Sequence, residues 1–152
     1  MGSSLLLLVV LFFGGVLGAP RVRQSAPDFS AAAVLPDLSF GTVSLASLTA
    51  NQHWTVLLFF PAAWTFVCPT ELIAFSEASA SFAARNVSLS FVSVDTKHSL
   101  LAWLQQPRRE GGLGLGFRVP LISDVTRQIC LAYDVLVDDH SEDHGLVPQR
   151  EA

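Results

Sequence analysis

Residues 59–71 read Phe-Phe-Pro-Ala-Ala-Trp-Thr-Phe-Val-Cys-Pro-Thr-Glu, and they connect an apolar run to a predicted helix. The run from Val56 to Phe60 predicts a buried strand. Pro69 suits the first position of a helix, because the amide hydrogen that it lacks would have no intrahelical partner there. The stretch therefore predicts a strand, a short connection that ends at Cys68, and a helix whose first residue is Pro69.

Cys68 stands where this helix should start. A thiol there faces unpaired amide donors and the positive end of the helix dipole, and both stabilise the thiolate. Glu71 fits the acidic first turn of the same helix. Cys130 lies instead in an apolar helical run, where a small buried thiol is ordinary. We therefore predict that Cys68 is the reactive cysteine of the two.

Length and composition limit the function classes. The chain has 152 residues, enough for one domain, and 51% of them are hydrophobic, including eleven Phe, so it can bury a core. The formal net charge is −4, and no basic block is longer than Arg108-Arg109. A nucleic-acid partner is therefore not expected, because the basic surface that such binding needs is missing.

Residues 1–18 are expected to be a signal peptide. Leu5 to Leu17 is almost continuously apolar, which matches the core of a secretory signal and is shorter than a membrane span. Val16 and Gly18 are small residues that suit cleavage before residue 19. We expect the mature chain in the endoplasmic reticulum lumen or outside the cell, with no stable membrane span after cleavage. The alternatives are an uncleaved anchor or a mispredicted first exon, with the chain in the cytoplasm.

Three strand–helix pairs follow along the chain. We predict strands at 54–60, 88–94 and 119–122, and helices at 69–85, 99–105 and from a cap at Ser123 or Asp124 to about Tyr133. Residues 30–50 predict short strands and turns, with a helical turn near 45–48. The alternation indicates one α/β domain over residues 19–137, around a largely parallel sheet. Because chemistry in such sheets lies beyond the carboxyl ends of the strands, Arg127 can lie near Cys68.

The stretch 59–71 resembles the peroxidatic site of the peroxiredoxin family, in its typical two-cysteine group (alkyl hydroperoxide reductase C and thiol-specific antioxidant). The resemblance runs from Ala26 to about Val137 and includes further motifs in the same order. These are Ser-Val-Asp at 93–95, Leu-Ala-Trp at 101–103, Pro-Arg-Arg-Glu-Gly-Gly-Leu-Gly at 107–114 and Pro-Leu-Ile-Ser-Asp-Val-Thr-Arg at 120–127. The resemblance implies a thioredoxin-like fold, a largely parallel central sheet flanked by helices, here lacking the usual C-terminal hairpin, helix and tail.

The resemblance also implies a thioredoxin-dependent peroxidase of antioxidant defence and redox homeostasis, which reduces hydrogen peroxide and organic hydroperoxides without a cofactor or metal. Cys68 would attack the peroxide as thiolate and become a sulfenic acid. Thr65 would hydrogen-bond the thiolate and the peroxide, and Pro61 would shield the site from water. Arg127 would stabilise the developing charge, oriented by a charge-assisted pair with Glu71.

The end of the chain departs from the family pattern. Residues 138–152 are expected to be an acidic, flexible tail without strands, and 138–144 are read as part of this tail and not as a metal site. The resolving cysteine of the two-cysteine group is absent, and Cys130 is a weak substitute. Thioredoxin or another thiol would be the reductant, and a homodimer or a ring of dimers the assembly. The alternative is a truncated, non-enzymatic isoform that only associates with full-length subunits.

Overall fold

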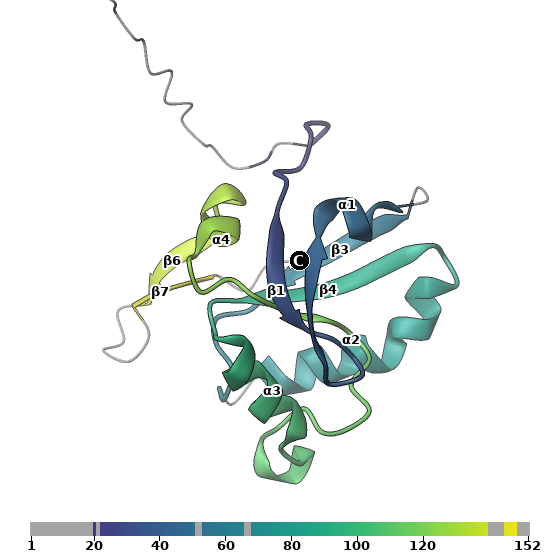
Figure 1. Ribbon diagram of the computed structural model, residues 1–152, viewed down its shortest axis with the longest axis vertical. Coiled ribbons are helices and arrows are strands. Elements are labelled where there is room, and N and C mark those ends of the chain that lie inside the picture. Colours follow the sequence, from purple (N-terminus) through teal and green to yellow (C-terminus); the bar gives the residue numbers. More distant parts are fainter. Residues whose placement is uncertain (1–19, 21, 51–52, 66–67, 140–144, 149–152) are drawn as a thin grey trace, which may run out of the picture.

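The computed structural model describes residues 20, 22–50, 53–65, 68–139 and 145–148. A five-stranded sheet in the order β2-β1-β5-β4-β3 forms its centre (Figure 1). The elements are β1 (Ser30–Val34), β2 (Phe40–Ser44), α1 (Leu45–Leu48), β3 (Trp54–Phe59), α2 (Cys68–Ala83), β4 (Val87–Ser93), α3 (Lys97–Gln105), a 3₁₀ turn (Arg108–Glu110), β5 (Leu121–Ser123), α4 (Gln128–Ala132), β6 (Leu136–Asp139) and β7 (Gly145–Pro148). The predicted signal peptide, residues 1–18, lies outside the described residues.

The three predicted strand–helix pairs are confirmed. β3, β4 and β5 are parallel, with Trp54 paired to Val87 and Phe91 paired to Leu121. β1 runs antiparallel to both β5 and β2, so the predicted largely parallel sheet is a mixed sheet whose parallel part is β3–β4–β5. Since parallel neighbours end at the same edge, the segments that follow these three strands meet at one side of the molecule.

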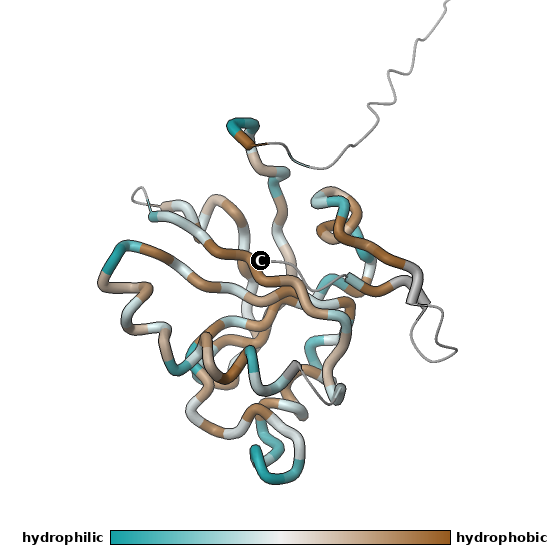
Figure 2. Tube along the Cα trace, turned by 180° about the vertical axis from the view of Figure 1, so that it is seen from behind, coloured by the Kyte–Doolittle hydropathy of each residue, from teal (hydrophilic) through white to brown (hydrophobic). Residues whose placement is uncertain are grey.

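Alternation along the strands divides the apolar residues between the two faces of the sheet. Phe91 and Leu121 belong to one buried cluster, and their neighbours Val92 and Ile122 belong to the other. This is the two-residue period of a strand that is buried on both sides. Residues of α2 and α3 complete the first cluster, and residues of α1 and α4 contribute to the second. Figure 2 shows the resulting apolar colour through the central strands.

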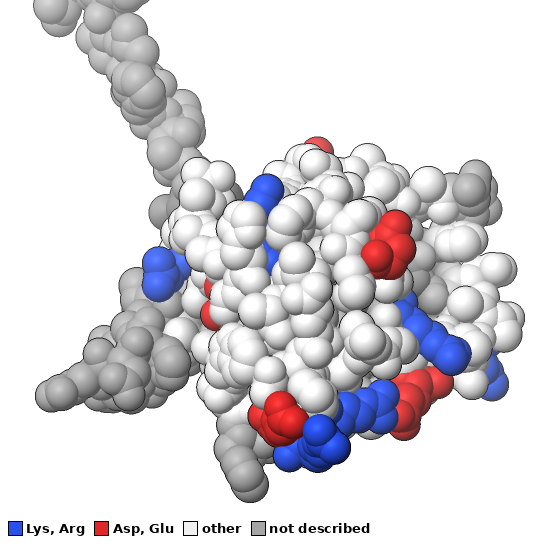
Figure 3. Space-filling model, turned by 60° about the horizontal axis from the view of Figure 1, so that its bottom comes forward, with Lys and Arg blue, Asp and Glu red and all other residues white. Residues whose placement is uncertain are grey.

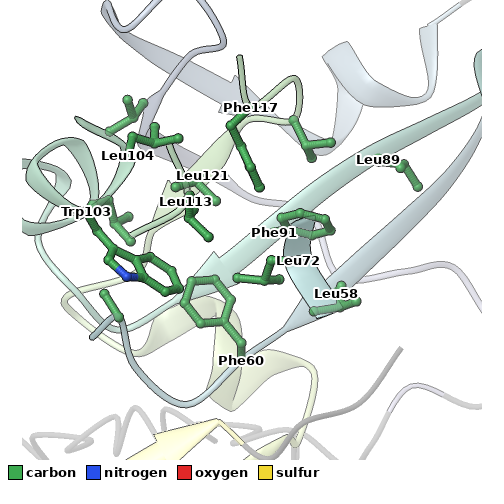
Figure 4. Packing of buried hydrophobic residues seen from close by; sticks show 14 residues of the cluster. Leu58, Phe60, Leu72, Leu89, Phe91, Trp103, Leu104, Leu113, Phe117 and Leu121 are labelled. Atoms are coloured by element: carbon green, nitrogen blue, oxygen red, sulfur yellow. The ribbon is translucent and has the colours of Figure 1, made fainter. Parts of the chain in front are cut away.

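Trp103 anchors the first cluster. Its side chain is fully buried, its ring centroid lies 5.9 Å from that of Phe60, and its Nε1 donates a 2.9 Å hydrogen bond to the carbonyl oxygen of Gly111 (Figure 4). The amide of Leu113 in turn donates to the carbonyl of Trp103, at 3.1 Å. The loop after α3 is thus fastened to the helix, and Leu113 packs in the same cluster.

A hairpin occupies part of the stretch predicted to be a flexible tail without strands. β6 and β7 pair antiparallel, with Val137 opposite Val147, and Val147 is buried. The prediction for residues 138–152 is therefore wrong at 138–139 and 145–148, and so is the expectation that a C-terminal hairpin is lacking. The acidic run hid the strand pattern, whereas cross-strand pairing of β-branched residues on either side of it supplies the hairpin.

The start of the last helix also differs from the prediction. Ser123 ends β5 and Asp124 is buried, and α4 begins only at Gln128 with Arg127 as its N-cap residue. Arg127 has φ 59°, in the left-handed region, so the chain makes a turn between β5 and α4. No helix in the described ranges is long and apolar enough to cross a membrane.

Candidate active site

The predicted site residues come from segments at the carboxyl ends of the parallel strands. Pro61 to Thr65 follow β3, Asp95 follows β4, and the turn at 124–127 follows β5. Cys68 is the first residue of α2, one residue earlier than predicted, and Glu71 lies in the first turn of this helix. The topology therefore brings together segments that are up to 66 residues apart, from Pro61 to Arg127, by the ordinary rule for open α/β sheets.

The connection between β3 and α2 is held from within and from β4. Ala62 and Ala63 are buried, and the amide of Ala63 donates a 2.7 Å hydrogen bond to Oδ2 of Asp95. Trp64 has φ 66°, a left-handed conformation that costs a non-glycine residue about 1 kcal/mol. Its Nε1 donates to Oγ of Ser99 at 3.3 Å, although half of the residue is exposed. Neighbouring contacts thus hold a backbone shape that the sequence alone would not favour.

Thr65 is half-buried, and its Oγ1 donates a 3.1 Å hydrogen bond to the carbonyl oxygen of Ala62. Because a hydroxyl has one proton and two lone pairs, Oγ1 in this position can accept from a ligand O–H. Pro61 is also half-buried, and it lacks an amide hydrogen. Both residues lie where the sequence places them, in the connection that leads to Cys68.

The structure describes the backbone of Cys68 but not its side chain, and it does not describe Phe66 and Val67. The predicted contacts of this thiol with Thr65 and Arg127 therefore stay predictions, and so does the pairing of Glu71 with Arg127. What the structure does give is the position of the Cys68 backbone at the N-terminus of a helix of 16 residues. That position favours a thiolate through the amide donors and the dipole of the first turn.

Arg127 is half-buried and precedes α4 by one residue, whereas the sequence predicts it inside the first turn. Its amide donates to the carbonyl of Asp124 at 2.8 Å, which closes the turn after β5. The left-handed conformation of Arg127 leaves no trace in the sequence, because arginine has no local preference for it.

Cys130 is a free thiol with no exposed surface. Burial raises the pKa of this thiol above its ordinary value, and hydrogen bonding to Asp124 and the negative charge of Asp124 raise it further. The positive charge of Arg127 opposes this only in part. A buried, protonated thiol is a poor nucleophile, so the structure gives no support to Cys130 as a substitute resolving cysteine.

A cleft of about 590 Å³ opens beside Thr65. Its other walls are the first two turns of α2 and the loop at 108–112. Arg108 binds Glu77 on the rim of this region, with 2.6 Å between Nη1 and Oε1. Figure 3 shows acidic and basic side chains interspersed on the face of the molecule that it displays. The charged residues that line the cleft are Arg108, Arg109 and Glu110, and the two arginines pair with Glu77 and Glu110.

In the part of the chain that the structure describes, no group of three or more His, Cys, Asp or Glu residues could hold a metal ion. The acidic run at 140–144, which the sequence assigns to a tail, lies outside that part.

The model of the AhpC/TSA family matches residues 22–151. The chain belongs to the AhpC/TSA family. Among relatives of this AhpC/TSA chain, peroxiredoxin-2 of Bos taurus is 44% identical over 119 residues, which are 78% of this chain and 58% of the relative. The chain spans about three fifths of the length of the peroxiredoxins that it matches.

Solved structures agree with the family. The reduced 2-Cys peroxiredoxin of Plasmodium vivax has a TM-score of 0.74 and 42% identity, over 82% of this chain and 72% of that one. Thioredoxin peroxidase I of Plasmodium yoelii has the same TM-score and identity, over 84% of this chain and 68% of that one. The thioredoxin-like peroxiredoxin fold that the sequence predicts for this AhpC/TSA chain is thereby confirmed.

Two carboxylates of the AhpC/TSA domain were not singled out by sequence reasoning for the contacts they make. Asp95 accepts the hydrogen bond from the connection after β3, and Asp124 accepts one from α4. Asp95 directly follows the predicted strand at 88–94, and Asp124 lies two residues after the predicted strand at 119–122. These positions are the signal that could have drawn attention to them.

Proposed function

We propose that this chain is a thiol-dependent peroxidase that reduces hydrogen peroxide and organic hydroperoxides at Cys68. The supporting observation is the position of Cys68 at the start of α2, beyond the carboxyl end of a parallel strand. The thiolate sulfur attacks one peroxide oxygen, the O–O bond breaks, and the other oxygen leaves as an alkoxide or hydroxide that takes up a proton. Cysteine is oxidised to the sulfenic acid, and the peroxide is reduced to an alcohol or water.

The neighbouring residues have proposed roles in the same step. Thr65 accepts a hydrogen bond from the protonated peroxide oxygen, consistent with the lone pairs left on its Oγ1. Pro61 keeps water from the thiolate. Arg127 stabilises the thiolate and the charge on the leaving oxygen, and Glu71 orients Arg127.

The sulfenic acid is returned to the thiol by thioredoxin or another thiol reductant. One thiol of the reductant displaces water from the sulfenic sulfur to form a mixed disulfide, and a second thiol releases Cys68. The name of the related Plasmodium yoelii thioredoxin peroxidase supports this reductant. Because Cys130 is buried, both thiols come from the reductant in this proposal. The assembly we propose, from the family resemblance, is a homodimer or a ring of dimers.

Stopped-flow measurement of peroxide consumption tests the proposal. The wild-type protein and Cys130→Ser should each consume one equivalent of peroxide rapidly and turn over with thioredoxin, and Cys68→Ser should do neither. A wild-type rate no faster than that of a free thiol would contradict the proposal. If that inactive protein co-purified with a longer peroxiredoxin subunit, the alternative of a non-enzymatic associating chain would be supported instead.

We also propose that the chain enters the secretory pathway. Asn86, in the sequon Asn-Val-Ser at 86–88, is exposed in the turn before β4. If residues 1–18 are a signal peptide, the intact mass of the protein from eukaryotic cells should show cleavage before residue 19. A glycan on Asn86 would increase this mass further. An unprocessed, cytoplasmic chain would contradict this proposal.

A further inference from the structure

We propose that Asp95 is a positioning residue for the peroxide reaction, because its carboxylate fixes Ala63 in the segment that follows β3 and precedes Cys68. The inference rests on the proposed function of Cys68. Asp95 lies at the carboxyl end of β4, 32 residues along the chain from Ala63, to which it is bonded. It does not itself touch the reacting atoms in this proposal.

One oxygen of Asp95 holds the connection. Oδ2 accepts the 2.7 Å hydrogen bond from the amide of Ala63 and a 2.8 Å hydrogen bond from Oγ of Ser93. The Oγ of Ser93 also accepts from the amide of Asp95, at 3.1 Å. The carboxylate is therefore fixed by its own strand, and it holds Ala63 through a bond to a charged acceptor, which is stronger than a bond between neutral groups.

The main chain of Asp95 is fastened to the next strand as well. Its carbonyl oxygen accepts a 2.7 Å hydrogen bond from Oγ of Ser123 in β5. The amide of Asp124 donates to the carbonyl of Ser93 at 2.8 Å, and the amide of Arg127 donates to the carbonyl of Asp124. Hydrogen bonds to residues 93–95 therefore hold both the segment that contains Thr65 and the turn that contains Arg127.

Loss of the Asp95 carboxylate would remove the hydrogen bond that holds Ala63, and with it the position of Thr65. Ala63 is followed by the left-handed Trp64 and then by Thr65, whose hydroxyl is bonded back to Ala62. A displacement of about 1 Å in a group that positions a substrate can slow a reaction by up to about 100-fold. The thiolate of Cys68 depends instead on the start of α2, so its reaction with a simple alkylating agent should not need Asp95.

The test compares Asp95→Ala, Asp95→Asn and the control Asp37→Ala. Asp37 is an exposed carboxylate that accepts hydrogen bonds from the amide and the hydroxyl of Ser39. For each protein we would measure the rate of Cys68 with hydrogen peroxide, the rate of Cys68 with iodoacetamide followed by peptide mass, and hydrogen exchange at the amide of Ala63.

Asp95→Ala should lower the peroxide rate by about tenfold or more, leave alkylation of Cys68 at least as fast, and speed exchange at Ala63. Asp95→Asn keeps a carbonyl acceptor for Ala63 and should recover most of the peroxide rate. Asp37→Ala should match the wild type in all three measurements. If the alanine variant is unstable, Asp95→Asn still tests the inference: its neutral carbonyl is the weaker acceptor, so the amide of Ala63 should exchange faster than in the wild type, and unchanged exchange would overturn the inference.

Two results would overturn the inference. One is an unchanged peroxide rate in Asp95→Ala, and the other is an equal fall in both the peroxide and the alkylation rates, which would indicate general damage. Failure of the proposed function looks different, because the wild-type protein would then itself react slowly with peroxide.

Discussion

The amide of Cys130 donates a 2.8 Å hydrogen bond to Oδ2 of Asp124, six residues earlier, and both residues are buried. The same carboxylate is one of the causes that raise the pKa of the Cys130 thiol, after burial itself. Cys130 is therefore kept neutral inside the second apolar cluster. The two cysteines of the chain stand in opposite environments, Cys68 at the start of α2 and Cys130 buried within α4.

We expect the two thiols to differ in reactivity with a charged aromatic disulfide such as Ellman's reagent. Cys68 should react in the native protein, because helix starts favour the thiolate, and Cys130 should react only after denaturation. Counting thiols released before and after addition of guanidinium checks this. Cys68→Ser should release none in the native state, and a native reaction of Cys130 would contradict its burial.

Stability should fall at alkaline pH on account of Cys130. The unfolded chain loses this proton above the ordinary thiol pKa of about 8.5, while the folded chain keeps it, so ionisation favours unfolding. Between pH 7 and pH 9.5 the wild type should lose about 1 kcal/mol of unfolding free energy more than Cys130→Ala. Denaturant unfolding at both pH values measures this difference. Equal losses in the two proteins would show that Cys130 ionises normally.

Asp124→Ala should destabilise the fold by about 1–3 kcal/mol, because the buried amide of Cys130 loses its acceptor. Asp124→Asn should cost less, since its carbonyl oxygen can accept the same bond. The control Asp37→Ala removes an exposed carboxylate, whose hydrogen bonds to Ser39 face solvent, and should lower stability less than Asp124→Ala does. Denaturant midpoints at neutral pH compare the stabilities of the three variants. An unchanged stability of Asp124→Ala would count against the hydrogen bond between the amide of Cys130 and Asp124.

Gly111 and Gly112 should respond differently to alanine. A Cβ on Gly112 would lie 2.1 Å from the backbone oxygen of Gln106, so the loop must move, at a cost of about 3 kcal/mol. A Cβ on Gly111 meets no atom within 4 Å, but the φ of 86° costs about 1 kcal/mol. The midpoint temperature of thermal unfolding should therefore be clearly lower for Gly112→Ala than for Gly111→Ala. The reverse order would contradict the packing of this loop on α3.

The sequence predicts the elements whose causes are local. The apolar run before Pro61 is sufficient to predict β3. The proline after Cys68 and the helical spacing of Leu72 and its apolar neighbours are sufficient to predict α2. Boundaries that depend on side-chain capping are less visible. Helix α3 begins two residues earlier than predicted, because Thr96 accepts a hydrogen bond from the amide of Ser99.

Features that depend on tertiary contacts could not be predicted. Asp124 was expected to cap the last helix, but its carboxylate reaches the amide of Cys130 and the helix begins later. Trp64 and Arg127 adopt left-handed conformations that their side chains do not encode. For the site, the sequence predicted which segments meet, because this follows from the order of parallel strands. The hydrogen bonds that align the segments come only from the folded chain.

The in-step pairing of β3 with β4, from Trp54–Val87 to Phe59–Val92, limits where the chain can change in length. An inserted residue inside β4 would shift Asp95 by about 3.3 Å relative to Ala63 and turn the later side chains to the wrong face. An insertion in the turn at 35–39, between β1 and β2 near the opposite edge of the sheet, would leave both ends of that hydrogen bond in place. The chain can therefore vary in length in the turn at 35–39 without disturbing the site, whereas a change in length within β4, which ends beside the site, would disturb it.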